Sequence, residues 1–248
     1  MVKFLPYLII LFFLFYLLAM HQESLLYSSN EGLADSAAQW PEYVMLDLHY
    51  LPSLEYFAAL LKYDYVYIEA HEHFQKQSYR NRCYIRAANK VDMLSVPVLD
   101  GRRKVLIRDI RIDYQQGWLK DHWRAITSAY GKSPFFEYYA PYFEQILFKK
   151  HTFLYDLNWE LLTKCLDLLQ IRKNIKPSSY YSKNLDLNTL DLRPVIHPKK
   201  NYLNNKIYRP FRYVQNFGSE FVPNLSIVDL LFCQGVEARQ SLELSVIR

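Results

Sequence analysis

The stretch YVYIEAHEHFQKQSYRNRCYI, residues 65–85, indicates the fold because its first part alternates between two kinds of side chain. Val66, Ile68 and Ala70 are apolar, whereas the residues between them are aromatic or polar. This period of two is typical of a strand that turns one face into a core. We therefore predict a strand over residues 65–71, followed by a polar loop.

Similar patterns predict the other elements of the chain. Strands are expected over residues 45–50, 83–86, 91–99 and 104–113, with a hairpin turn at AANK. Helices are expected after the N-cap Ser53, along residues 118–130, after Pro134, after the N-cap Asn158 and after Ser226. Together these elements predict an α/β fold with a mixed sheet flanked by helices in a single main domain.

Two segments near the carboxyl end have more specific patterns. Residues 173–209 are polar and rich in Asn, Ser, Lys and Pro, which predicts a long loop. In PNLSIVDLLFCQG, Ser226 and Asp229 have the spacing of a capping box, and Gly235 marks the end of a helix. We therefore expect structural roles for both side chains, with Asp229→Asn costing less stability than removal of the Ser226 cap.

The first 44 residues differ from the rest of the chain. Residues 4–20, FLPYLIILFFLFYLLAM, carry no charge, and no convincing cleavage site follows them, which favours an uncleaved membrane anchor over a signal peptide. Alternatively, Met45 is the native start and residues 1–44 are a start-site artefact. We expect the domain to span residues 45–248 and to be cytoplasmic, membrane-associated only if residues 4–20 form an anchoring helix.

Composition restricts the classes of partner. The net charge of +5 comes from dispersed Lys and Arg, which indicates an anionic small molecule and gives no sign of nucleic-acid binding. Glycine is scarce, and neither G-x-G-x-x-G nor a P-loop occurs, so no dinucleotide or Walker-type cradle is predicted. The widely spaced Cys83, Cys165 and Cys233 predict free thiols in a reducing compartment.

The candidate site follows the strand predicted over residues 65–71. Alternation places Glu69, His71 and His73 on one face, where a histidine can act as general base and Glu69 can fix its tautomer. In open α/β sheets, the loops after the strands bind the ligands. We therefore predict that the following loop adds substrate-binding side chains: Lys76, Tyr79, Asn81 and Arg82.

Further residues and alternatives bear on this site. His197 and Lys199, in VIHPKK, are expected to close over an anionic substrate, and the alternative is a solvated charge cluster. The E-x-H-E-H pattern is also compatible with the solvated outer face of a strand. H-x-H permits zinc, but no further ligands stand at a recognised spacing, so no metal or cofactor is predicted. His122 lies among apolar neighbours and is expected to be structural.

Five ordered segments resemble a known family: YLPSLEYFAALL, EAHEHFQKQSYRNRCYI, LSVPV, HWRAITSAYGKSPFFEYY and FVPNLSIVDLLF. They are similar to the WbqC-like proteins over about Met45 to Ala238. Many members have Gln-Pro where this chain has Leu48 and His49, and an acidic pair where it has Ala70 and His71. The family's F-x-K-x-x-x-x-N-R core is retained as Phe74, Lys76, Asn81 and Arg82.

The resemblance implies a transferase of glycine or another aminoacyl group in bacterial O-antigen or other surface-polysaccharide synthesis. The expected substrate is anionic, nucleotide-linked or amino-acid-derived. We expect His71 or His73 to be the base, and both to share one pocket with Lys76, Asn81 and Arg82. The alternatives are a non-catalytic module that binds a sugar or a partner protein, and a metal-dependent hydrolase.

Overall fold

The computed structural model describes residues 41–101, 103–181, 185–186 and 188–248. The membrane anchor predicted for residues 4–20 lies outside these described residues. Within them, every helix is too short or too polar to cross a membrane. Residues 41–248 make up one compact unit, in which all the elements below are found.

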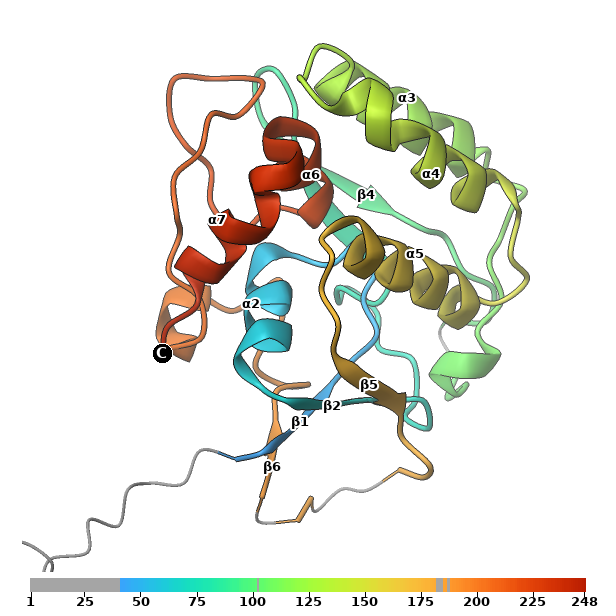
Figure 1. Cartoon of the computed structure of the whole chain (residues 1–248). Coiled ribbons are helices and arrows are strands. Elements are labelled where there is room, and N and C mark those ends of the chain that lie inside the picture. The colour runs from blue at the N-terminus through green and yellow to red at the C-terminus, as the bar shows by residue number, and fades with distance from the viewer. Residues whose placement is uncertain (1–40, 102, 182–184, 187) are drawn as a thin grey trace, which may run out of the picture. The chain divides into compact units, whose positions relative to one another are not determined.

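The main sheet has four parallel strands in the order β5-β2-β1-β6 (Figure 1). Their bounds are Tyr43–Leu46 for β1, Tyr65–Ile68 for β2, Asn174–Pro177 for β5 and Thr189–Asp191 for β6. In β2, Val66 and Ile68 are buried whereas Tyr65 is exposed, which confirms the alternation read from the sequence. Short parallel strands bury little by themselves, so helices must cover them.

A hairpin forms the second sheet. β3, Arg82–Arg86, pairs antiparallel with β4, Val91–Ser95, and the backbone N–H of Ala87 donates to the carbonyl of Lys90 across the turn. The hairpin at AANK is therefore confirmed. The predicted α/β fold with strands of both orientations is confirmed too, with the two orientations divided between two sheets.

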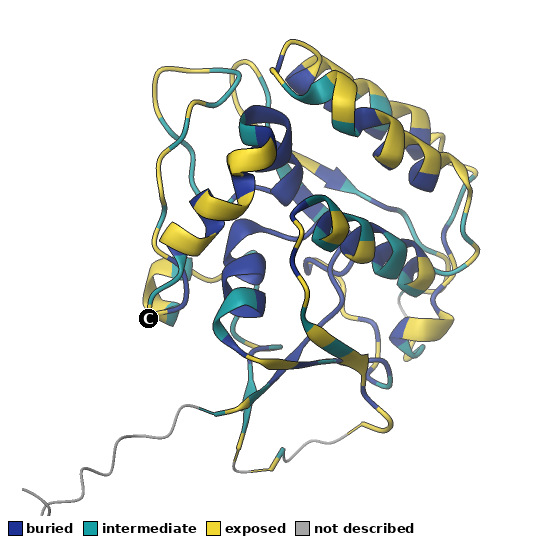
Figure 2. Cartoon of the chain, viewed as in Figure 1, coloured by how far each residue is buried: buried dark blue, intermediate teal, exposed yellow. Residues whose placement is uncertain are grey.

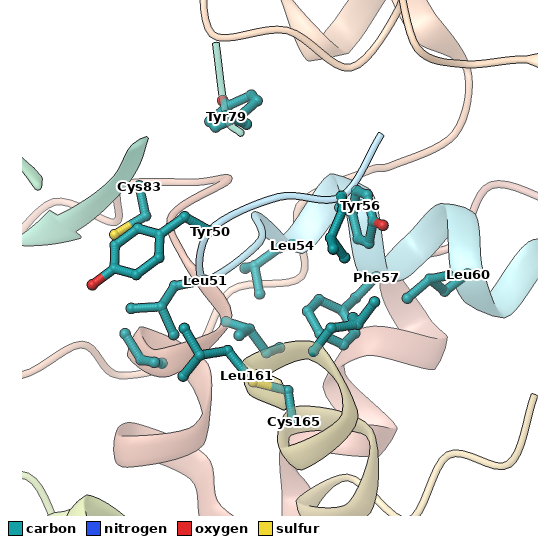
Figure 3. Packing of buried hydrophobic residues seen from close by; sticks show 14 of the residues in the cluster. Tyr50, Leu51, Leu54, Tyr56, Phe57, Leu60, Tyr79, Cys83, Leu161 and Cys165 are labelled. Carbon is teal, nitrogen blue, oxygen red and sulfur yellow. The ribbon is translucent and has the colours of Figure 1, made fainter. Parts of the chain in front are cut away.

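Helices surround the sheets, and one of them is central. α2, Leu54–Lys62, is buried along most of its length (Figure 2). Its side chains Leu54 and Phe57 pack toward Leu161 and Cys165 of α5 (Figure 3). The bounds of the remaining α-helices are Trp118–Tyr130 for α3, Phe136–Phe148 for α4, Leu154–Leu168 for α5, Ile227–Gln234 for α6 and Ala238–Ser245 for α7.

Five predicted elements were wrong in extent or type. The strands predicted over residues 65–71 and 91–99 end at Ile68 and Ser95. The first strand ends at Leu46. Residues 47–50 are all buried, so they do not alternate between buried and exposed side chains as the sequence pattern suggested. Residues 104–113 contain a 3-10 helix, Ile107–Asp109, where a strand was predicted. The predicted loop at 173–209 contributes β5 and β6, since short polar strands at a sheet edge leave little apolar pattern in a sequence.

The predicted caps have mixed outcomes. Asn158 is not an N-cap but lies inside α5, fully buried. Ser53 stands at the start of α2, yet its side chain makes no capping bond there. Ser226 does accept from the backbone N–H of Val228 at 3.5 Å. The carboxylate of Asp229 is turned instead to side chains of the core, and the three cysteines are free and buried, as predicted.

Candidate functional site

Polar residues follow all four strands of the main sheet at its carboxyl edge. Asp47 comes directly after β1, Glu69 after β2 and Ser178 after β5, while Asp191 ends β6. Because the strands are parallel, these four positions lie at the same edge. Open α/β sheets bind their ligands at this edge, so the edge is a candidate ligand-binding site.

Glu69 is fully buried between groups from β5 and β6. Its Oε2 accepts from Nη1 of Arg193 at 2.8 Å, and Arg193 also pairs with Asp191 at 2.7 Å. Its Oε1 accepts from Oγ of Ser178 at 2.9 Å and from the backbone N–H of His71 at 2.7 Å. None of these described partners is an imidazole ring, so Glu69 positions the backbone of His71 and not its tautomer.

The two candidate bases have different surroundings. Nε2 of His71 lies 3.0 Å from the carbonyl oxygen of Ser178 and must donate to it, since a carbonyl only accepts. The neutral ring therefore keeps a lone pair on Nδ1. His73 is exposed, and its backbone bridges to Leu106. Because β2 ends at Ile68, the alternation expected to place both histidines on one face stops before it reaches them.

A second group of buried charges lies beside Asp47. Nη2 of Arg80 is 2.8 Å from Oδ1 of Asp47, and Nε of Arg80 donates to Oε1 of Glu72 at 2.7 Å. The side chains of Asp47, Arg80 and Glu72 are 2%, 3% and 8% exposed, respectively. Burial, reinforced by the charge of Asp47, raises the pKa of Glu72 to about 8. Glu72 therefore holds a proton at neutral pH, next to the carboxylate of Asp47.

An aromatic cluster covers this group of charges. The ring of His49 lies 4.6 Å from that of Tyr56 and 5.2 Å from that of Tyr79, measured between centroids. Burial, followed by the positive charge of Arg80, lowers the pKa of His49 well below its usual value, so the ring is neutral. Tyr79 is thus packed in the core, where burial raises the pKa of its hydroxyl.

A cleft of about 600 Å³ lies along the loop QKQSYRNR and is named the basic cleft below. Lys76, Asn81 and Arg82 line it, together with Arg103 and one described carboxylate, Asp100. Asp100 pairs with Arg103 at 3.2 Å. In the part of the chain that is described, neither Lys76 nor Arg82 has a paired carboxylate. The basic cleft is therefore electropositive, which fits an anionic ligand.

Two polar atoms at the basic cleft have no hydrogen-bond partner in the described chain. Nδ2 of Asn81 donates to the carbonyl of Val96 at 2.8 Å, but Oδ1 of this residue is left without a partner, as is Nε of Arg82. Most buried polar atoms in proteins are paired. Phe74 also lines the basic cleft, so the whole F-x-K-x-x-x-x-N-R core meets at one place.

The VIHPKK segment, distant in sequence, lies next to the basic cleft. Nζ of Lys199 donates to Oε1 of Gln77 at 2.7 Å, and Gln77 lines the cleft. Nδ1 of His197 accepts from the backbone N–H of Lys199 at 3.2 Å. Burial, then the charge of Arg80, lowers the pKa of His197. The segment is therefore close enough to contribute to the site.

The structure thus brings together only part of the predicted site. Lys76, Asn81 and Arg82 share one cleft, but His71 and His73 are not among its described lining residues. Among the residues described, no group of three or more His, Cys, Asp or Glu could hold a metal ion.

Sequence reasoning missed four charged residues of the carboxyl edge. Glu72 stands inside E-x-H-E-H and Arg80 inside SYRNR, and neither was named as a candidate beside its neighbours. Asp47 had a usable signal, since a charged residue directly after a buried strand is a candidate. The sequence carried no signal for Arg193, because its place at the carboxyl edge depends on β6, and the residues of β6 were predicted to be part of a loop.

Comparison with known proteins adds three findings. The sequence model of the WbqC-like protein family matches residues 48–197 and 197–241. A Mycobacterium tuberculosis protein (strain ATCC 25618 / H37Rv), described as uncharacterized protein Rv1507c, is 28% identical over 214 residues, which cover 77% of this chain and 92% of that protein. No solved structure matches the chain significantly. The family match contains the basic cleft and, apart from Asp47, the carboxyl edge.

Proposed function

The chain belongs to the WbqC-like protein family, and from this premise we propose that it is a transferase that binds an anionic substrate in the basic cleft. The reaction class we propose is transfer of an aminoacyl group, such as glycine, onto a precursor of a bacterial surface polysaccharide such as O-antigen. The donor is nucleotide-linked or otherwise activated through an anionic leaving group.

One observation carries this proposal: Lys76 and Arg82 line the same cleft without a paired carboxylate in the described chain. Two like charges that line one cleft repel each other, and the repulsion is relieved when an anion binds in that cleft. Nearby, Oδ1 of Asn81 and Nε of Arg82 have no described partner. Arginine suits phosphate and carboxylate groups, because its guanidinium can donate two parallel hydrogen bonds.

His71 supplies the proton acceptor in this proposal. A hydroxyl or amine of the acceptor attacks the carbonyl carbon of the donor, so that a new C–O or C–N bond forms and the bond to the leaving group breaks. Nδ1 of His71 takes the proton of the attacking group, since Nε2 donates to the carbonyl of Ser178. Because His71 is not among the described residues that line the basic cleft, this step requires the carbonyl of the bound donor to extend from the cleft to His71. Lys76 and Arg82 stabilise the negative charge that develops on the leaving group.

A second function, a non-catalytic binding module, is favoured by a different observation. The buried carboxyl groups are already paired: Asp47 forms an ion pair with Arg80, Glu72 accepts a hydrogen bond from Arg80, and Glu69 forms an ion pair with Arg193. Groups that satisfy one another stabilise a scaffold and need no substrate to complete them. Turnover of a bound molecule by the purified protein separates the two functions, because a binding module returns it unchanged.

The experiment begins with the full chain and mass spectrometry of the small molecules that co-purify with it. Calorimetric titration with a nucleoside diphosphate such as UDP then measures anion binding. Lys76→Ala and Arg82→Ala should each weaken it by at least about 1.5 kcal/mol, the low end for charge-assisted hydrogen bonds. Lys120→Ala is the matched control, because Lys120 is exposed on α3 and does not line the basic cleft.

His71→Ala separates binding from chemistry. If His71 is the proton acceptor, this variant should bind the anion with unchanged affinity and lose turnover of the co-purifying donor. Normal UDP binding by a protein with both Lys76→Ala and Arg82→Ala would exclude the basic cleft as the anion site.

A further inference from the structure

A second cavity, about 850 Å³ in volume, lies along one face of α5 and is named the α5 groove below. One wall is formed by Tyr155, Trp159 and Thr163, which are four residues apart and so lie above one another on the helix. The other wall is residues 149–153, and Pro177 at the end of β5 also lines it. No residue of the basic cleft lines this groove in the described chain.

The helical wall of the α5 groove presents two aromatic rings. The ring centroids of Tyr155 and Trp159 are 5.9 Å apart, and the ring planes differ by 18°. Both side chains are only half-buried, although they pack on the core. The two rings are stacked on each other, so the face that the pair leaves for a ligand is an outer ring face, which is flat and apolar and favours a ligand with a flat apolar face of its own.

The charges of the α5 groove balance, in contrast to those of the basic cleft. Nζ of Lys149 pairs with Glu160 at 2.8 Å, and Nε2 of His151 lies 2.5 Å from the same carboxylate. Burial lowers the pKa of His151, so its ring adds no charge at neutral pH. The remaining pair is Lys150 and Asp156, one of each sign. A groove without net charge favours an uncharged ligand.

Hydrogen-bonding groups surround the aromatic wall. Asp156 and Glu160 stand next to Tyr155 and Trp159 in sequence and supply acceptors for hydroxyl groups. The side chain of His151 is 6% exposed, and its Nδ1 has no hydrogen-bond partner in the described chain. A flat apolar wall edged by acceptors matches a saccharide, whose ring has C–H groups on its faces and hydroxyl groups around its edge.

We propose that the α5 groove binds an uncharged saccharide ring, stacked on an outer face of the Trp159–Tyr155 pair, with Asp156 accepting hydrogen bonds from its hydroxyl groups. Pro177 precedes Ser178, whose carbonyl binds His71, so the bound ring would lie beside the carboxyl edge of the main sheet. That the saccharide is the acceptor of the transfer rests on the proposed function. Binding of the saccharide does not, and it is tested separately.

The test is ligand-observed NMR and calorimetry on the full chain with a panel of uncharged mono- and oligosaccharides, without any donor. At least one saccharide should bind, and Trp159→Ala should weaken it at least about tenfold, whereas Trp159→Phe should retain most of the affinity. Asp156→Ala should weaken it about threefold. Because Asp156 is exposed, this second variant does not threaten the fold. Tyr138→Ala, an exposed aromatic on α4 outside the groove, is the matched control and should bind normally.

Three results would overturn the inference. They are an absence of binding across the panel, binding that Trp159→Ala and Asp156→Ala leave unchanged, and binding of a free nucleoside in place of saccharides with the same dependence on Trp159. The protein with Lys76→Ala and Arg82→Ala should bind the saccharide as well as the unmodified chain does. Failure at the basic cleft can therefore be told apart from failure at the α5 groove.

Discussion

Asn158, in the middle of α5, donates a hydrogen bond from Nδ2 to the backbone carbonyl of Arg80 at 2.7 Å. Asn158 is fully buried, and Arg80 forms an ion pair with Asp47 and donates a hydrogen bond to Glu72. One amide thus ties the loop of the basic cleft to the helix that forms the wall of the α5 groove. Both cavities therefore depend on the placement of a single helix.

Asn158→Ala should lower the free energy of unfolding by about 1–3 kcal/mol, because it leaves the carbonyl of Arg80 buried without its donor. Urea denaturation measures the change. Asn89→Ala, at the exposed turn between β3 and β4, is the control and should change stability by less than about 0.5 kcal/mol. An equal cost for both variants would show that the bond contributes nothing.

Glu72 should make stability fall as pH rises through the neutral range. Its folded pKa of about 8 lies above the usual value of 4.5, so the folded chain binds more protons than the unfolded chain between these two values. Stability therefore decreases with pH over this window. Glu72→Gln imitates the protonated form, so it should be near neutral at pH 5 and stabilising at pH 9. Unfolding curves at both pH values test this, and a difference that stays constant with pH would contradict it.

Asp229→Asn should cost more stability than Ser226→Ala, the reverse of what the capping-box spacing predicts. The carboxylate accepts from the hydroxyls of Tyr130 at 2.8 Å and Tyr213 at 2.5 Å, and from Nε2 of Gln215 at 3.0 Å. An amide in its place puts a donor against one of these donors, for an expected cost of about 1–3 kcal/mol. Removing the cap should cost about 1 kcal/mol. Thermal denaturation of the two variants ranks them.

Shortening the chain to Pro41 should preserve its cooperative unfolding, whereas shortening it to Met45 should not preserve its full stability. The second truncation removes Tyr43 and the fully buried Val44 from β1, which pairs with strands on both sides. Loss of Val44 alone should cost about 1.5–3 kcal/mol of burial. Equal urea midpoints for the two shortened chains would show that the amino-terminal half of β1 is dispensable.

The sequence was informative wherever one face of an element is buried. The alternation around Val66 and the helical stripe of α2 are direct consequences of such burial, and both were found. It was uninformative where an element is stabilised by its neighbours. β5 and β6 are short and polar, and only their pairing with β2 and β1 makes them strands.

The site was predictable to the same extent. Lys76, Asn81 and Arg82 could be grouped because they are close in sequence and belong to one loop. The ion pairs of Asp47 with Arg80 and of Glu69 with Arg193 could not be predicted in this way, because each joins segments distant in sequence that only the tertiary fold brings together. Burial of Glu72, which decides its protonation, likewise comes from segments distant in sequence.

The order β5-β2-β1-β6 also has a consequence for how the protein is made. Tyr43 of the central strand β1 pairs with Thr189, so β1 emerges from the ribosome long before its second neighbour is synthesised. At about 5–20 residues per second, synthesis from Tyr43 to Thr189 takes roughly 7–30 seconds, and during this time the edge of β1 has no β6 to pair with. Contacts this distant in sequence slow folding and leave a strand edge open to other chains. Yield in the cell should therefore be limited by chaperone supply during synthesis, more than by the stability of the finished fold.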